Sequence, residues 1–266
     1  MENTALVGRG MNARTLKIIA AVTMVCSHIG VTLNTFYGGG FAIMDYIGRF
    51  AAPIFFMLAA DGAVKTRDFN KYLLRIVLFA VISEMPFDFL FSYYFTGKFS
   101  LVYWGQQNVM WTLAIGVLAI KCCEKSRKTT DITLKILFAA CVAGLIILAK
   151  IAKTDYDMGG VAFMVACYIF RNNRKLRALA AWFVWVFFVC GLYFFFDPRY
   201  EFAAVAAWIT RTGVYKICEG TAPLFALLLY NGAQGKRFPK YAFYTFYPAH
   251  ILIIAAVFYP IVRAFA

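Results

Sequence analysis

The sequence predicts an all-α, polytopic membrane protein with about nine or ten transmembrane helices in one integral membrane domain, residues 1–266. Two observations predict this fold class. The chain is 62% hydrophobic and only 15% charged, whereas soluble globular chains are about half apolar and about a quarter charged. Apolar runs close to the roughly 20 residues that cross a bilayer also recur from one end of the chain to the other.

Helices, and not the strands of a barrel, are expected to form these spans. Barrel strands alternate polar and apolar residues over about ten positions, and windows such as 16–33 and 132–151 show no such alternation. A helix satisfies its own backbone hydrogen bonds in lipid. The first apolar run lacks the small-residue cleavage site of a signal peptide, so we expect a true span after a short amino terminus, residues 1–14.

Hydropathy, read together with glycine, proline and charge, places nine spans along the chain. They are expected near residues 15–36, 41–64, 70–95, 107–122, 131–150, 158–171, 176–197, 215–231 and 240–265. Residues 200–212 are too few to cross unaided and are expected to form an interfacial or re-entrant helix. If they crossed, the count would be ten.

The net charge of +14 would suggest a nucleic-acid partner in a soluble protein, but the cations here cluster in short connections between spans. Nine spans put every cation-rich connection on the side of the amino terminus, which the positive-inside rule makes cytoplasmic. We therefore expect membrane lipids, and no nucleic acid, as partners. The seven cysteines form no C-x-x-C pair, so no metal site is expected.

The first span carries His28 at a depth of about 18 Å, and Lys17 lies on the same helix face about 16 Å nearer the cytoplasm. An ionisable side chain inside a membrane costs a few kcal/mol, which favours a functional role. Histidine can act as a base near neutral pH. The alternative is that Lys17 snorkels to head groups and His28 only hydrogen-bonds a neighbouring helix.

The second span carries Asp45 and Arg49 one turn apart, and Asp61 follows three turns later. A guanidinium cannot lose its charge and must find a carboxylate, carbonyl, phosphate or oxyanion. This favours a functional role for Arg49, although an i,i+4 pair with Asp45 would also account for it.

The third span carries Glu84 and Asp88 on either side of Pro86. The proline frees a backbone carbonyl, and two carboxylates beside it suggest a polar cavity. The alternative is that these carboxylates neutralise Arg49 or Arg75 on neighbouring helices.

Three further positions are polar near span ends. Asn108 opens the fourth span, and Asp155 and Tyr156 precede the sixth; capping of the helix that follows is the default interpretation for these residues. His250 lies in the last span close to Tyr247. Both histidines of the chain therefore fall within predicted spans.

The stretches LKIIAAVTMVCSHIG, IGRFAAPIFFML, YLLRIVLFAVISEMPFD, QNVMWTLAIG, TDYDMGGVAFM, and LLLYNG with KYAFYTFYPAHILII cover most of residues 16–255. Together they resemble the TraX family, membrane proteins named for the acetylase of conjugative pilin. The spacing of Lys17 and His28 is also similar to a pattern in acyltransferase-3 enzymes, which implies a transmembrane acyltransferase-like bundle. One residue departs from the family, which usually has Asp-His-Ile-Gly where this chain has Ser27 before His28.

The resemblance implies transfer of an acetyl group from cytosolic acetyl-CoA to an amine or hydroxyl of an unknown acceptor. A protein amino terminus, a peptide, a sugar and a lipid are all compatible, and a pilin-like or secreted peptide is one such acceptor. It also implies a bacterial cytoplasmic membrane. We expect His28 to act as base or acyl carrier, and Arg49 to stabilise the oxyanion. The site is expected to include Glu84 as a third catalytic residue, Lys17 and Asn108 at the coenzyme, and Ser27, Asp61, Asp88, Asp155, Tyr156, Tyr247 and His250 around the substrates.

Two other classes of protein stay open. An ion-coupled transporter would use Asp45, Asp61, Glu84 and the histidines as a proton path. It predicts an internal repeat, and none is visible in the sequence. A non-catalytic assembly factor for a pilin-like or secreted partner is the other alternative.

Overall fold

The computed structural model describes residues 10–37, 40–189, 191 and 219–265, and the regular structure of this part is helical, which confirms the predicted fold class. Residues 200–212, expected to form an interfacial helix, lie outside the described residues. The helices are α1 (Ala13–Tyr37), α2 (Ala42–Gly48), α3 (Ala51–Lys65), α4 (Phe69–Thr96), α5 (Val109–Lys128), α6 (Ile132–Ile151), α7 (Asp157–Ile169), α8 (Arg174–Phe188), a helix at Glu219–Leu229, and α10 (Ala242–Phe265).

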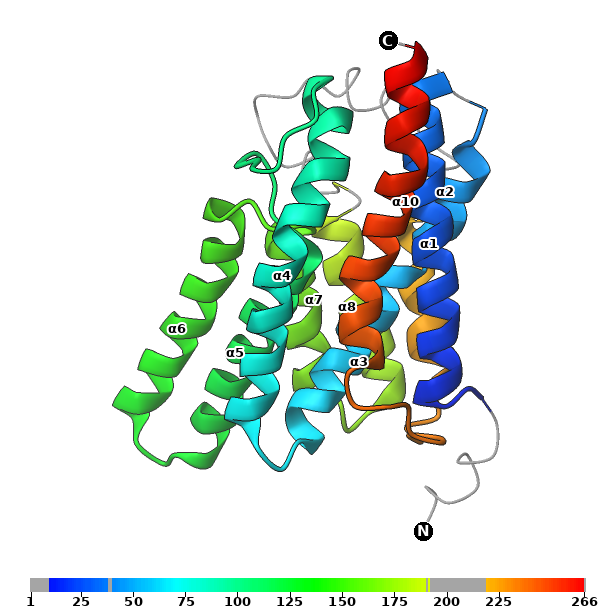
Figure 1. Ribbon diagram of the computed structural model, residues 1–266. Helices are drawn as coiled ribbons and strands as arrows, with labels where there is room; N and C mark the ends of the chain where they lie inside the picture. The colour runs from blue at the N-terminus through cyan, green and yellow to red at the C-terminus, as the bar shows by residue number, and fades with distance from the viewer. Residues whose placement is uncertain (1–9, 38–39, 190, 192–218, 266) are drawn as a thin grey trace, which may run out of the picture.

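The helices run up and down roughly parallel to one another (Figure 1). Four segments are long and apolar enough to cross a membrane, namely Ala13–Tyr37, Ala42–Lys65, Ile132–Ile151 and Ala242–Pro260. The start of α1 and the connections α3–α4, α5–α6, α7–α8 and 230–241 lie at one end of the bundle. We call this end the basic face, because it gathers Lys65, Lys71, Lys125, Arg127, Lys128, Arg171, Arg174, Lys236, Arg237 and Lys240.

The predicted second span is not one helix, because it breaks at Arg49 and Phe50 between α2 and α3. Pro53 lies four residues after Arg49. A proline ring collides with the carbonyl four residues earlier and offers no N–H to it, so the regular helix is interrupted there. The break places Arg49 at a helix end and not along a continuous helical face.

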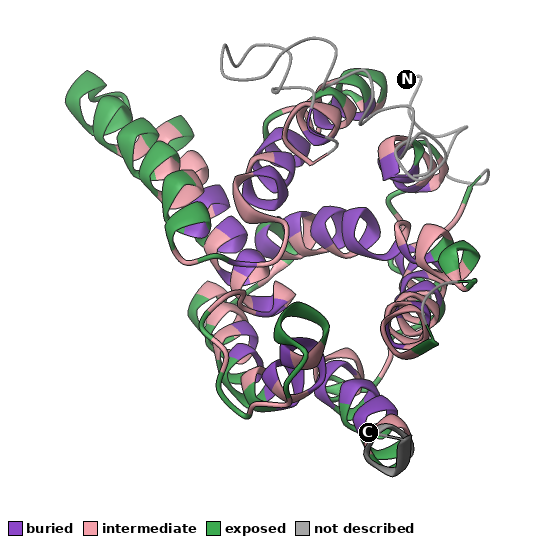
Figure 2. Cartoon of the chain, turned by 90° about the horizontal axis from the view of Figure 1, so that it is seen from above, coloured by how far each residue is buried: buried purple, intermediate pink, exposed green. Residues whose placement is uncertain are grey.

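Helix α3 forms the centre of the bundle and packs against α1, α5 and α7, whereas α6 lies at the rim against α5 and α7. Figure 2 shows the buried residues of α3 in the middle and the exposed length of α6 projecting outward. Side chains cap five of the described helices: Asn12, Asp68, Asn108, Asp131 and Asn173 accept from the backbone at the starts of α1, α4, α5, α6 and α8. The capping interpretation of Asn108 is therefore confirmed.

Gly48 allows α2 to lie directly against α1. A Cβ atom at this position would come within 2.9 Å of the Ser27 Cα atom, closer than real Cβ contacts allow. We expect Gly48→Ala to lower the free energy of unfolding by about 1–3 kcal/mol, because overpacking forces the helices apart. Thermal unfolding in detergent, followed by circular dichroism, measures the change. Gly144→Ala on α6 is the matched control, since nothing lies within 4 Å of its added Cβ. Equal melting temperatures for the two variants would contradict the account.

Candidate functional site

Two histidines from opposite ends of the sequence meet inside the bundle. His28 lies on α1 and His250 on α10, and Nδ1 of His28 is 2.8 Å from Nε2 of His250. The two rings stack with their centroids 4.9 Å apart. His250 is buried and His28 is half-buried. The sequence predicted that both lie in spans but gave no sign that they touch.

The tautomers of this pair follow from its hydrogen bonds. Nδ1 of His250 is 2.9 Å from the carbonyl oxygen of Phe246, which can only accept, so Nδ1 carries the proton. Nε2 of a neutral His250 is then an acceptor, and Nδ1 of His28 donates to it. Nε2 of a neutral His28 keeps its lone pair and makes no hydrogen bond to the described residues. The pair therefore presents one basic nitrogen.

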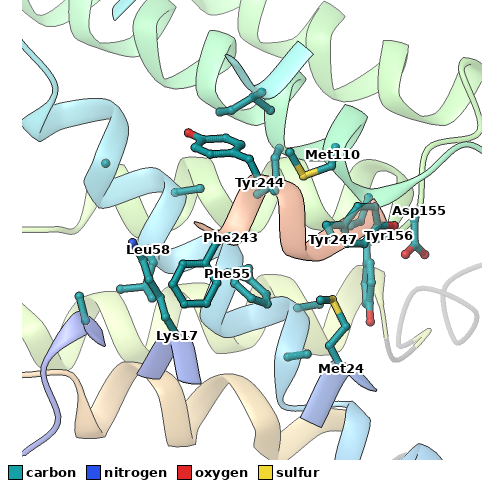
Figure 3. Close-up of a pocket in the computed structure, with 18 of the residues that line it drawn as sticks. Lys17, Met24, Phe55, Leu58, Met110, Asp155, Tyr156, Phe243, Tyr244 and Tyr247 are labelled. Carbon is teal, nitrogen blue, oxygen red and sulfur yellow. The ribbon is translucent and has the colours of Figure 1, made fainter. Parts of the chain in front are cut away.

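A cavity of about 270 Å³ leads from the basic face to His28. Toward the basic face it is lined by Lys17, Asp61 and Tyr230. The ammonium of Lys17 lies 5.5 Å from the ring centre of Phe243, and Figure 3 shows the two side chains close together. Lys17 and His28 line the same cavity, which confirms that they share a helix face. We call this space the first cavity.

A second cavity of about 570 Å³ lies on the other side of His28, toward the end of the bundle opposite the basic face. Its polar walls are Asp45, Arg49, Gln106 and Glu219, and its apolar walls include Phe87, Phe91, Tyr94 and Phe95. Four residues line both cavities: Ser27, His28, Asp155 and Tyr156. His28 therefore lies where cavities from the two ends meet.

A network of charges forms one wall of the second cavity. The hydroxyl of Ser27 donates to Asp45 at 3.2 Å, and Asp45 pairs with Arg49 at 3.1 Å. Arg49 also lies 3.7 Å from Glu219. The charge of Arg49 is thus offset, and Asp45 supplies a carboxylate next to Ser27. Sequence reasoning missed Glu219, although a carboxylate near the start of an apolar span is the same signal that identified the others.

Asp61 lies at the opposite end of the first cavity, near the basic face. It accepts from Lys65 at 3.3 Å and pairs with Arg177 at 3.6 Å. Lys65 also donates to the hydroxyl of Tyr230 at 3.4 Å. Arg177 is buried in α8, where the carboxylate of Asp61 balances its charge.

The structure places Glu84 outside both cavities. Its carboxylate accepts from the side chain of Asn108 and from the indole N–H of Trp111 at 2.7 Å, tying α4 to α5. Asp88 is buried and accepts from the backbone of Tyr103 at 2.9 Å. Neither carboxylate pairs with an arginine among the described residues, so that alternative is wrong. Glu84, Asp88 and Asn108 hold helices and a loop in place, and none of the three lines either cavity.

Asp155 and Tyr156 come from the turn between α6 and α7. Capping by Asp155 is contradicted, because the residue at the start of α7 is Tyr156 and no side chain caps the helix. Both residues instead line the first and the second cavity, as His28 does. Tyr247, buried on α10, lines the first cavity.

The fold and the site define a class: a polytopic helical membrane protein with a histidine pair where two cavities meet. The family model described as TraX protein matches residues 12–258, and the chain belongs to the TraX family. It is 26% identical over 243 residues to the "Probable fimbrial assembly protein FimC, serogroup H1" of Dichelobacter nodosus, covering 91% of this chain and 93% of that protein. No solved structure matches the chain.

The tautomer of His28 can be measured directly. We expect ¹⁵N NMR of histidine-labelled protein in detergent to show a protonated Nδ1 and a bare Nε2 on His28, because His250 can only accept from it. The chain has two histidines, so a His250→Gln variant leaves one ring and assigns the signals. A proton on Nε2 of His28 at neutral pH would contradict the arrangement.

Proposed function

We propose that this chain is a membrane-embedded acetyltransferase, in which acetyl-CoA enters the first cavity from the cytoplasm and the acceptor enters the second from the opposite side. The observation that carries the proposal is Nε2 of His28, which makes no hydrogen bond to a described residue and lies at the junction of the two cavities. The family resemblance supports the choice of acetyl-CoA. On this proposal the basic face is the cytoplasmic one.

The first cavity has features that suit a long anionic donor. Lys17 lies about 16 Å from His28 along α1. The first cavity therefore has a cation near its mouth and a base at its inner end, and an extended arm of the coenzyme would span the distance between them. Arg14 lies one turn before Lys17, and the 230–241 connection adds three cations at the same end. Cations at this end would hold the phosphates of the coenzyme.

The proton balance of the transfer requires one base. Nε2 of His28 takes the proton of the acceptor as the new C–N or C–O bond forms, and the C–S bond to coenzyme A breaks. The proton then passes to the coenzyme's sulfur, so His28 ends the cycle neutral. His250 holds the ring of His28 in the tautomer that this step needs.

Turnover should depend on His28. We expect His28→Ala to reduce coenzyme A release from acetyl-CoA by about 10²–10⁴-fold, the usual contribution of a general base. The assay uses purified full-length protein in detergent with crude envelope extract as acceptor. Cys26→Ala is the control on the same helix, because Cys26 lines neither cavity. Absence of turnover by the wild type, or full activity of His28→Ala, would refute the proposal.

A non-catalytic assembly factor is the second candidate, favoured by the name of the Dichelobacter nodosus relative as a fimbrial assembly protein. It predicts that a His28→Ala variant still supports assembly in cells. The transporter alternative places Glu84 on a proton path, but Glu84 lines neither cavity. The geometry therefore supports a transporter less than it supports an acetyltransferase.

A further inference from the structure

The turn between α6 and α7 holds an unusual backbone. All the non-glycine residues with positive φ in the described chain lie there: Lys153 at 51°, Tyr156 at 65° and Asp157 at 48°. Such conformations cost about 1–3 kcal/mol each and persist only where surrounding contacts enforce them, most often at functional sites. The cost makes a purely connecting role a poor explanation for this turn.

Contacts with the start of α5 enforce the shape. The backbone N–H of Gln107 donates to the carbonyl of Lys153 at 2.9 Å, and the N–H of Asp155 donates to the carbonyl of Gln107 at 2.9 Å. The hydroxyl of Thr112 donates to the carbonyl of Asp155. These bonds fix the backbone of Asp155 from both sides.

The result is a carboxylate that lines the same two cavities as the base. Asp155 lines both cavities, as His28 does, and it accepts from Gln106 at 3.2 Å. Figure 3 shows it at the inner end of the first cavity, near Tyr156 and Tyr247. Asp155 therefore lies at the junction of the two cavities.

Charged and titratable groups surround Asp155 from each neighbouring element: His28 on α1, Arg49 after α2, Glu219 at the start of its helix and Tyr247 on α10. Burial raises the pKa of the Asp155 carboxyl to about 6, and the Arg49 guanidinium limits the rise. The carboxyl is therefore ionised at neutral pH and becomes protonated as the pH falls through about 6.

We propose that Asp155 is a second catalytic residue, whose carboxylate accepts a hydrogen bond from one N–H of an amine acceptor and holds the nucleophilic nitrogen at the junction, while another hydrogen of that nitrogen faces His28. This inference rests on the proposed acetyl transfer. Asp155 stays a carboxylate throughout, since the proton goes to His28. Its role is to direct the lone pair of the acceptor toward the acyl carbon.

The test compares Asp155→Asn with Asp157→Asn in the full chain. Asparagine at 155 can still accept from Gln106, so the fold is preserved while the charge is lost. Asp157 is the matched control two residues away: its carboxylate pairs with Lys150 at 3.4 Å and lines neither cavity. The readouts are binding of coenzyme A by thermal shift, and coenzyme A release from acetyl-CoA at graded amounts of envelope extract between pH 5 and 8.

We expect Asp155→Asn to lower kcat/KM for the extract about 10- to 100-fold, as expected for loss of a hydrogen bond to a charged group. The Kd for coenzyme A should change less than about twofold, and Asp157→Asn should match the wild type. The wild-type kcat/KM should fall as the pH drops through about 6, and this fall should be smaller in Asp155→Asn, where protonation of His28 still contributes but protonation of the carboxylate does not.

The failures are distinguishable. Suppose that the wild type turns over, and that Asp155→Asn has the same kcat/KM and the same loss of activity in acid. That result overturns the role of Asp155 and leaves the proposed acetyl transfer standing. Loss of coenzyme A binding in Asp155→Asn assigns the residue to the fold and also overturns the role. Absence of wild-type turnover overturns both proposals.

Discussion

The contact between His28 and His250 depends on the register of the helices that carry them. The register of helix α1 is determined by its packing against α2, where Gly48 lets Ser27 approach closely. The register of helix α10 is determined by its packing against α4, where the ring centres of Phe79 and Tyr244 lie 5.4 Å apart. A shift of one residue along either helix would rotate an imidazole by about 100° and break the pair. The basic nitrogen thus depends on packing far from it.

Charge balance is the second constraint on this bundle. A bilayer interior tolerates ionised groups only when they pair or face a polar cavity. Arg49 meets Asp45 and Glu219, and Arg177 meets Asp61. Each ion pair includes a residue that lines a cavity: Asp45, Arg49 and Glu219 line the second cavity, and Asp61 lines the first.

Sequence alone predicted the helical membrane class, the cation-rich connections and the shared face of Lys17 and His28. These follow from hydropathy and from the period of one helix. The break at Arg49 was also open to prediction, because Pro53 lies four residues later. Periodicity says nothing about which helices meet, so the contact between residues 222 positions apart could not be predicted. For the same reason Glu84 and Asn108 were interpreted as site residues, although they bond to each other and line neither cavity.

The central claim is that His28 joins a donor cavity on the basic face to an acceptor cavity on the opposite face. Oriented proteoliposomes test it most directly, with labelled acetyl-CoA on one side of the membrane and envelope extract on the other. Protease sensitivity of the amino-terminal segment reports the orientation. The account predicts labelled acceptor only when acetyl-CoA is on the side of the basic face and the extract is opposite. Labelling that requires donor and acceptor on the same side, or donor on the opposite face, would contradict it.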